Sequence, residues 1–262
     1  MSCLQHGTTT VVAYLSSFAP AAEIAFAAAS AAGIRAYLGL TLMDRNTPEA
    51  LTTTTARAER EMLALVEKYH RKGRNEFVVT PRFAISCSEA MLQLCGKMSR
   101  AHNTLLQTHI SENKSEIEET LRLFPGAASY TDVYDRFGCL HERTLLGHGI
   151  HLSEAELNLI SAQKSVIVHC PVSNNFLGSG IMPYQLYIQR GIRTGLGTDV
   201  AAGYSLSMLN EARQMTEMAK LLSHFRAQDM RVGAERAVYQ ATLGNALCLG
   251  RNDLGCFEPG RR

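Results

Sequence analysis

The sequence lacks the features that mark several classes of protein. It has no Cys-x-x-Cys pair, and its seven cysteines are an odd number, so neither a disulfide framework nor a thiolate zinc site is indicated. No basic segment followed by an apolar run opens the chain, which argues against a signal peptide. The longest apolar stretch, residues 18–34, contains Pro20 and Glu23 and is too weakly hydrophobic to span a bilayer. We therefore expect a cytoplasmic protein with free thiols and no membrane segment.

An excess of charge of one sign is also absent. The chain has 26 Lys and Arg residues against 24 Asp and Glu residues, which are interspersed and give a net charge of +2. Such a balance provides no basic patch for a nucleic acid or a membrane surface. Hydrophobic residues make up 46% of the 262 residues and no low-complexity linker divides them, so the composition indicates one folded domain.

Short β-prone runs alternate with helical patterns along almost the whole chain. We predict seven strands, at residues 8–15, 35–42, 77–80, 104–109, 144–148, 165–169 and 193–199. Helices are predicted around residues 62–69, from about residue 88, and over residues 21–32, 115–123, 153–162, 184–190, 207–222 and 233–249. Repeated βα units predict an α/β fold with a parallel sheet, and a closed (β/α)8 barrel of the TIM type has eight strands, one more than this count.

Polar residues follow several of the predicted strands. They are Arg82, His109, His148 and Asp199. The carboxyl ends of barrel strands converge on one face, where active sites lie. We therefore expect these four side chains to belong to one site.

Two of these strand ends combine groups that suit metal binding and proton transfer. A neutral imidazole at His109 can bind zinc, and Glu112 on the following turn can move protons in the same pocket. Asp199 ends a glycine-rich apolar strand, where burying a carboxylate is costly unless it meets a cation or a hydrogen-bond donor. We therefore interpret Asp199 as a metal ligand that also accepts a proton. Each residue also has a structural interpretation: His109 as a structural histidine, Glu112 as an acid at a helix N-terminus, and Asp199 as an N-cap. His148 is placed to bond the attacking water or the tetrahedral intermediate.

The run from His169 through Cys170 and Pro171 to Ser173 and Asn174 follows the next strand. We interpret it as a strand-ending turn, in which Ser173 and Asn174 bond the local backbone. No catalytic role is assigned to His169.

Together these segments resemble the amidohydrolase superfamily, and within it the guanine deaminases. The motifs are Thr-Pro-Arg-Phe at residues 80–83, His-x-x-Glu at 109–112, Gly-His-Gly at 147–149, His-Cys-Pro-x-Ser-Asn at 169–174 and Gly-Thr-Asp at 197–199. Gly-Thr-Thr-Thr at residues 7–10 also matches, so the resemblance covers essentially the whole chain.

The resemblance implies a zinc (β/α)8 barrel that converts guanine and water to xanthine and ammonia. It implies that His109 and Asp199 bind the metal and also lie against the substrate, and that Glu112 shuttles a proton to the purine. Arg82 and the backbone of Phe83 would bind the carbonyl edge of the ring. Glu112, His148 and Asp199 are the expected catalytic residues, with one Zn²⁺ in each subunit of a homodimer.

The sequence departs from the family pattern at its start. The family's first strand ends in a His-x-His pair that supplies two further zinc ligands, and this chain contains no such pair. We therefore expect residues 1–262 to be an incomplete amidohydrolase barrel without its first strand and most of a small β domain. His109 and Asp199 alone give two ligands, fewer than the three of a catalytic zinc site. Imidazole and carboxylate would also suit iron.

Two other functions remain open. One is a deaminase or chlorohydrolase of another purine or heterocycle, although Arg82 and Phe83 favour guanine. The other is an inactive, truncated chain that acts as an assembly partner for complete subunits.

Overall fold

Parallel strands form at all seven predicted places. The computed structural model describes residues 2–261. The strands are β1 (Thr10–Tyr14), β2 (Arg35–Gly39), β4 (Asn75–Pro81), β5 (Leu105–Ile110), β6 (Thr144–His148), β7 (Val166–His169) and β8 (Arg193–Leu196). A two-residue strand, β3 (Thr41–Leu42), continues the direction of β2 and pairs with Thr80 and Pro81 of β4. The prediction of an α/β fold with a parallel sheet is confirmed.

The chain divides into two compact units. The first comprises residues 1–108 and 118–144, and the second comprises residues 109–117 and 145–262. Strand β5 begins in the first unit, while its last two residues, His109 and Ile110, belong to the second.

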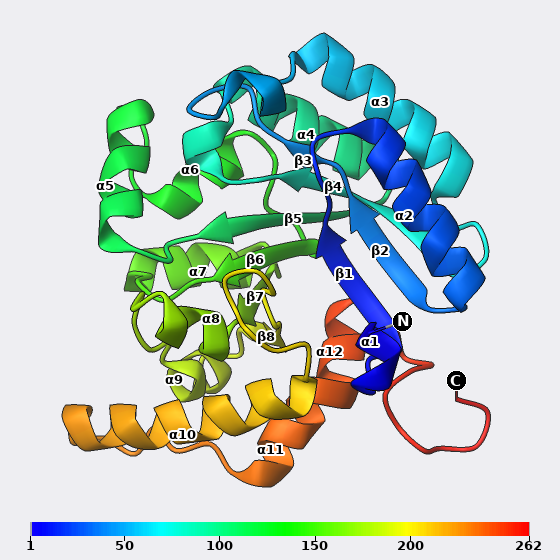
Figure 1. The fold of residues 1–262 in the computed structure, drawn as a ribbon. Coiled ribbons are helices and arrows are strands. Elements are labelled where there is room, and N and C mark those ends of the chain that lie inside the picture. Colours follow the sequence, from blue (N-terminus) through cyan, green and yellow to red (C-terminus); the bar gives the residue numbers. More distant parts are fainter. Residues whose placement is uncertain (1, 262) are drawn as a thin grey trace. The chain divides into compact units, whose positions relative to one another are not determined.

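The first unit contains the parallel strands β1, β2 and β4 and the start of β5. Thr10 lies opposite Arg35, Leu38 opposite Phe77, and Val78 opposite Leu105. The helices of this unit are α1 (Ser2–Gln5), α2 (Ala19–Ala32), α3 (Thr55–Tyr69), α4 (Glu89–Ala101) and α6 (Tyr130–Arg136), with short 3₁₀ turns at Glu49–Leu51 and Ala84–Ser86. Helix α2 packs on β2, and α3 and α4 pack on β4 (Figure 1). Apolar side chains from both layers, including Phe26, Met62 and Phe77, are fully buried between them.

The helices of the first unit begin and end at residues that satisfy their free backbone groups. Ser88 accepts a hydrogen bond from the backbone N–H of Met91, and Thr54 does so from Arg57. Gly33 ends α2 with a φ of 69°, a left-handed conformation that glycine adopts at low cost.

The second unit contains the parallel strands β6, from Leu145 on, β7 and β8. Its helices are α7 (Glu154–Ala162), α8 (Pro171–Phe176), α9 (Tyr184–Gln189), α10 (Met208–Arg226), α11 (Ala234–Tyr239) and α12 (Asn245–Cys248). Helix α5 (Lys114–Leu123) begins in this unit. The predicted capping box of α7 is present: Ser153 accepts from the backbone of Glu156, whose side chain accepts from the backbone of Ser153.

Three predicted elements of the second unit are wrong in their bounds. The helix predicted over residues 207–222 continues to Arg226. The strand predicted over residues 193–199 ends at Leu196, where its pairing with β7 ends opposite His169, and Asp199 is left-handed with a φ of 46°. The helix predicted over residues 233–249 is interrupted by a π-helix at Gln240–Gly244. Hydrogen bonds to β8 accompany this interruption: the Gln240 amide donates to the carbonyl of Thr194, and Asn245 bonds both the N–H and the carbonyl of Leu196. Side-chain amides thus satisfy backbone groups along an edge of β8.

Within residues 2–261, no helix combines the length and the apolar character that crossing a membrane would need.

Gly96, in the middle of α4, lets the loop at Phe137 and Gly138 approach the helix. A Cβ at this position would stand 2.2 Å from the carbonyl oxygen of Phe137 and 2.8 Å from the carbonyl carbon of Gly138. Both neighbours are backbone atoms, so a side chain here requires the loop to move.

We predict that Gly96→Ala destabilises the protein by about 1–3 kcal/mol, although alanine is the better helix former, because the overpacking outweighs the helix propensity. Urea unfolding measures the difference. Gln93→Ala on the exposed side of the same helix is the control and is expected to change stability by less than about 0.5 kcal/mol. A Gly96→Ala protein as stable as wild type would show that the loop is not held against the helix.

Candidate active site

Four predicted site residues lie in the second unit, at the carboxyl ends of strands. His109 is the penultimate residue of β5, and His148 is the last residue of β6. Glu112 stands between β5 and α5, and Asp199 lies three residues after the end of β8. The order of strands along the chain therefore brings together residues that are far apart in the sequence.

The backbone at these strand ends is left-handed at three non-glycine residues. The φ angles are 48° at Ser111, 71° at His148 and 46° at Asp199. Such conformations cost about 1–3 kcal/mol each and gather at functional sites. Backbone hydrogen bonds hold them: the carbonyl of Ser111 accepts from Ile150, and that of Asp199 accepts from Gly203.

The imidazole of His148 lies between the two carboxylates of the site. Its Nε2 is 3.7 Å from an oxygen of Glu112 and 3.8 Å from an oxygen of Asp199. The ring of His109 stacks on that of His148 with 5.5 Å between the ring centres. The His148 side chain is 2% exposed, whereas the side chains of Glu112 and Asp199 are 16% and 28% exposed. The arrangement suits proton transfer at a surface that a small molecule can reach.

Helix α8 supplies two further contacts that the sequence interpretation missed. Ser173 donates a hydrogen bond of 2.7 Å from Oγ to Asp199, and the Oδ1 of Asn174 lies 2.9 Å from Nδ1 of His148. Because an amide oxygen only accepts, Nδ1 of His148 carries the proton of this bond and Nε2 faces the carboxylates. Residues 169–174 are thus not a turn closed by bonds to the local backbone. The adjacent polar pair of Ser173 and Asn174, in the first turn of a helix that begins at Pro171, is the signal in the sequence that points to this role.

Glu112 and Glu116 have separate tasks at the start of α5. Glu116 accepts hydrogen bonds from the backbone N–H groups of Glu112 and Asn113, which is the helix N-terminal role considered above for Glu112. The side chain of Glu112 instead accepts a bond of 2.8 Å from Ser179 and faces His148. Its carboxylate is therefore directed to the site and not to the helix end.

Two buried titratable groups, Glu211 and His169, lie near this cluster. Burial, with the nearby Asp199 carboxylate adding to it, raises the pKa of Glu211 to about 8 although a hydrogen bond from Val172 opposes the shift. Burial, assisted by His148, lowers the pKa of His169 to about 3. At neutral pH Glu211 is therefore mostly protonated and His169 is neutral.

Arg82 and Phe83 belong to the first unit, directly after β4. The guanidinium of Arg82 lies 4.8 Å from the centre of the Phe83 ring. The carbonyl of Arg82 accepts from Thr108, and the next N–H, that of Ala84, donates to the hydroxyl of Tyr134. These bonds fix the backbone on either side of Phe83, while the Arg82 side chain extends to the exposed surface.

The residues present do not complete a metal site. Among residues 2–261, no three His, Cys, Asp or Glu side chains converge in a way that would hold a metal ion. His109 and Asp199 have the donor atoms that zinc accepts, but a catalytic zinc needs at least three protein ligands.

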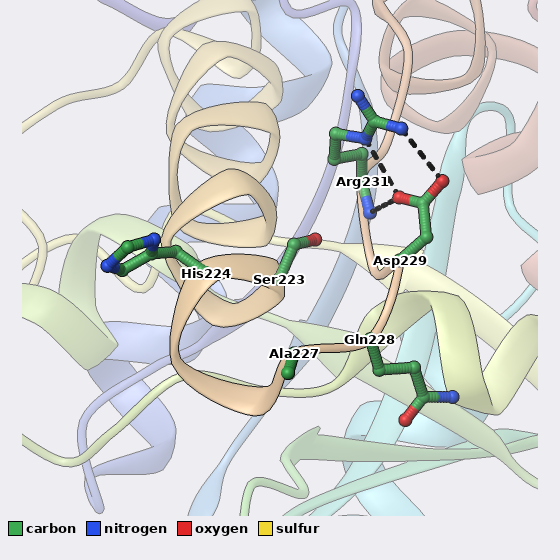
Figure 2. A pocket seen from close by; sticks show the side chains of 6 residues that line it. All are labelled: Ser223, His224, Ala227, Gln228, Asp229 and Arg231. Carbon is green, nitrogen blue, oxygen red and sulfur yellow. Dashed lines mark hydrogen bonds and ion pairs between the residues drawn. The ribbon is translucent and has the colours of Figure 1, made fainter.

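A surface hollow at the end of α10 has a different character (Figure 2). Its lining comprises Ser223, His224, Ala227, Gln228, Asp229 and Arg231. Asp229 and Arg231 pair with each other across 2.9 Å, and none of the predicted site residues lines the hollow. We assign it no function.

Comparison with known proteins identifies the relatives of this chain. Residues 1–262 match the model of the Amidohydrolase family. The chain is 39% identical over 259 residues to a protein of Deinococcus radiodurans named "Probable guanine deaminase", covering 98% of this chain and 58% of that protein. The chain thus spans little more than half the length of this relative.

Solved structures agree. A guanine deaminase from C. acetobutylicum with guanine in its active site is 33% identical, has a TM-score of 0.95, and is matched over 99% of this chain and 62% of that one. A zinc-bound adenosine deaminase from Xanthomonas campestris, 24% identical with a TM-score of 0.87 over 97% of this chain and 56% of that one, shows the shared fold. The TIM-type amidohydrolase fold that the sequence predicts is confirmed.

We predict that the 262-residue chain retains well below one zinc ion per chain after equilibration with zinc and dialysis, because too few ligands converge. Elemental analysis gives the ratio. Asp199→Asn is the matched variant and is expected to retain no less zinc than wild type. One zinc per wild-type chain that Asp199→Asn loses would contradict the prediction.

A second prediction concerns Glu211 and pH. The pKa of its carboxyl is raised on folding, so its contribution to stability is complete below the unfolded value near 4.5 and is lost as pH rises towards about 8. Wild type should therefore lose more stability between pH 5 and pH 8.5 than Glu211→Gln, by an amount on the order of a few kcal/mol. Urea unfolding midpoints at the two pH values test this, and equal losses in both proteins would refute it.

Proposed function

We propose that this chain, which belongs to the amidohydrolase family, carries most of the active site of a hydrolase that deaminates guanine. The reaction would convert guanine and water to xanthine and ammonia. The observation that carries the proposal is the placement of His148 between the carboxylates of Glu112 and Asp199, on strand ends that match guanine deaminases over 98% of the chain.

Each group of the cluster suits one part of this reaction. Hydrolytic deamination adds water to the ring carbon that bears the amine, and it requires a proton on the ring and another on the departing ammonia. Glu112, partly exposed and bonded by Ser179, is the group we assign to carry the proton to the ring. Nε2 of His148 faces the same space and can hydrogen-bond the oxygen that becomes attached to the ring carbon. Asp199 is assigned to accept the proton that leaves the attacking water.

Arg82 and Phe83 are assigned to substrate binding. A guanidinium presents planar donors that match a carbonyl edge, and guanine carries a carbonyl where adenine carries an amine. The aromatic ring of Phe83 lies beside that guanidinium. This chemistry favours guanine over adenine as the substrate.

Zinc, a homodimer and a cytoplasmic location complete the proposal. His109 and Asp199 are assigned as zinc ligands by their donor atoms; because the described residues do not complete a site, no step of the reaction is assigned to the metal. All seven cysteines are free, which supports a reducing compartment. Exposed apolar side chains in the second unit, among them Phe176, Tyr204 and Leu209, support a protein interface.

The proposed function is tested in a chimera. The C. acetobutylicum guanine deaminase supplies the part of its chain that this protein does not match, and this protein replaces the matched part. We expect a zinc-containing chimera to release ammonia and form xanthine from guanine but not to deaminate adenine. A folded, zinc-containing chimera that acts on adenine or a chlorinated triazine and leaves guanine unchanged would refute the substrate. A folded chimera without any hydrolase activity would favour an inactive assembly partner.

In the same chimera, we predict that Glu112→Gln lowers the turnover rate by about 10²–10⁴-fold, because the amide cannot carry the proton. Steady-state xanthine formation measures the effect. Glu118→Gln, at an exposed position of α5, is the control and should leave the rate unchanged. A Glu112→Gln rate close to that of the parent would remove Glu112 from the proton-transfer step.

A further inference from the structure

Glu211, on helix α10, is a fully buried carboxylic acid outside the reacting cluster. Its exposed fraction is 0%. Its Oε2 accepts a hydrogen bond of 3.1 Å from the backbone N–H of Val172, while its Oε1 has no hydrogen-bond partner among residues 2–261. Burying a carboxylic acid costs free energy of folding, and the single bond to Val172 offsets only part of that cost.

The bond falls at a point where α8 has no cap of its own. The N-cap residue, Cys170, makes no side-chain hydrogen bond to the helix, and the first helical residue, Pro171, has no backbone N–H. The N–H of Val172 is thus the first free donor of α8. A residue from another helix, 39 positions further along the chain, satisfies it.

The two residues that follow Val172 hold the reacting groups. Ser173 bonds Asp199, and Asn174 bonds His148. A displacement of α8 at Val172 would therefore move both contacts together, since six residues of helix behave as one short rigid element. A second link between the helices, from Asn175 to Gln214 at 3.3 Å, lies at the exposed side.

We propose that Glu211 is a positioning residue, whose bond to Val172 sets the place of α8 and thereby the orientation of Asp199 and His148. This positioning role rests on the proposed function only because it takes Asp199 and His148 as reacting groups. Its chemical requirement is an acceptor oxygen at the length of a glutamate side chain; a negative charge is not needed. Glutamine meets the requirement, because its amide oxygen can accept the same N–H, whereas aspartate is one methylene too short and methionine has no oxygen.

The test uses NMR of the 262-residue chain and requires no turnover. Hydrogen exchange of the Val172 amide reports its bond to Glu211, and the ring nitrogen signals of His148 at fixed pH report the proton on Nδ1. Glu211→Gln should preserve both. Glu211→Met and Glu211→Asp should speed Val172 exchange about tenfold and abolish the single protonated Nδ1 state of His148. Gln214→Met is the control on the same face of α10 and should alter neither signal.

Each outcome decides the question. Unchanged Val172 exchange and an unchanged His148 ring in Glu211→Asp would overturn the proposal, and this variant remains informative where the methionine protein does not fold. Faster Val172 exchange together with a changed His148 ring in a folded Glu211→Gln protein would also overturn it, because the charge of Glu211 and not its acceptor oxygen would then hold α8. A chimera that fails to deaminate guanine while these signals behave as expected would refute the proposed function and leave the positioning role intact.

Discussion

The site depends on the two hydrogen bonds that consecutive residues of α8 make to groups from different strands. Ser173 fixes a carboxylate that follows β8, and Asn174 fixes an imidazole that ends β6. Each contact alone contributes little: about 0.5–1.5 kcal/mol for the neutral bond of Asn174 and about 1.5–3 kcal/mol for the bond of Ser173 to a carboxylate. Carried on one short helix, they become mutually dependent. The geometry of Asp199 relative to His148 is therefore a property of α8 and its attachment.

Backbone hydrogen bonds explain why strained backbone persists at the strand ends. Left-handed conformations occur at Ser111, His148 and Asp199, and the side chains of His148 and Asp199 face each other in the site. The strain is tolerable because neighbouring N–H groups bind the carbonyls of the strained residues, as Gly203 does for Asp199. Side-chain amides from Gln240 and Asn245 fix β8 just before that strained segment. The stable parallel strands thus support a small, less regular set of loops.

Local patterns in the sequence predict the strands well and the site only in part. Hydrophobic runs locate all seven strands, and Ser153 with Glu156 locates the start of α7, because these signals are local. Helix α8 escapes prediction since its cap comes from Glu211 on another helix, which no local pattern contains. The π-helix at Gln240–Gly244 escapes for the same reason: the side-chain amide of Gln240 binds a strand far away in sequence. Strand ends predict which residues gather; long-range hydrogen bonds decide how they point.

The carboxyl groups in and around the cluster differ in burial and in charge. Two carboxylates, Glu112 and Asp199, lie 3.7 and 3.8 Å from Nε2 of the same imidazole, that of His148. Burial raises the pKa of Glu211, with the nearby Asp199 carboxylate adding to the shift, and so keeps Glu211 protonated near neutral pH. A charged Glu211 would add a third carboxylate beside the pair and compete for the same proton. In the proposed function, the neutral acid would hold α8 in place without taking part in the proton balance, which assigns proton exchange with the substrate to Glu112 and Asp199.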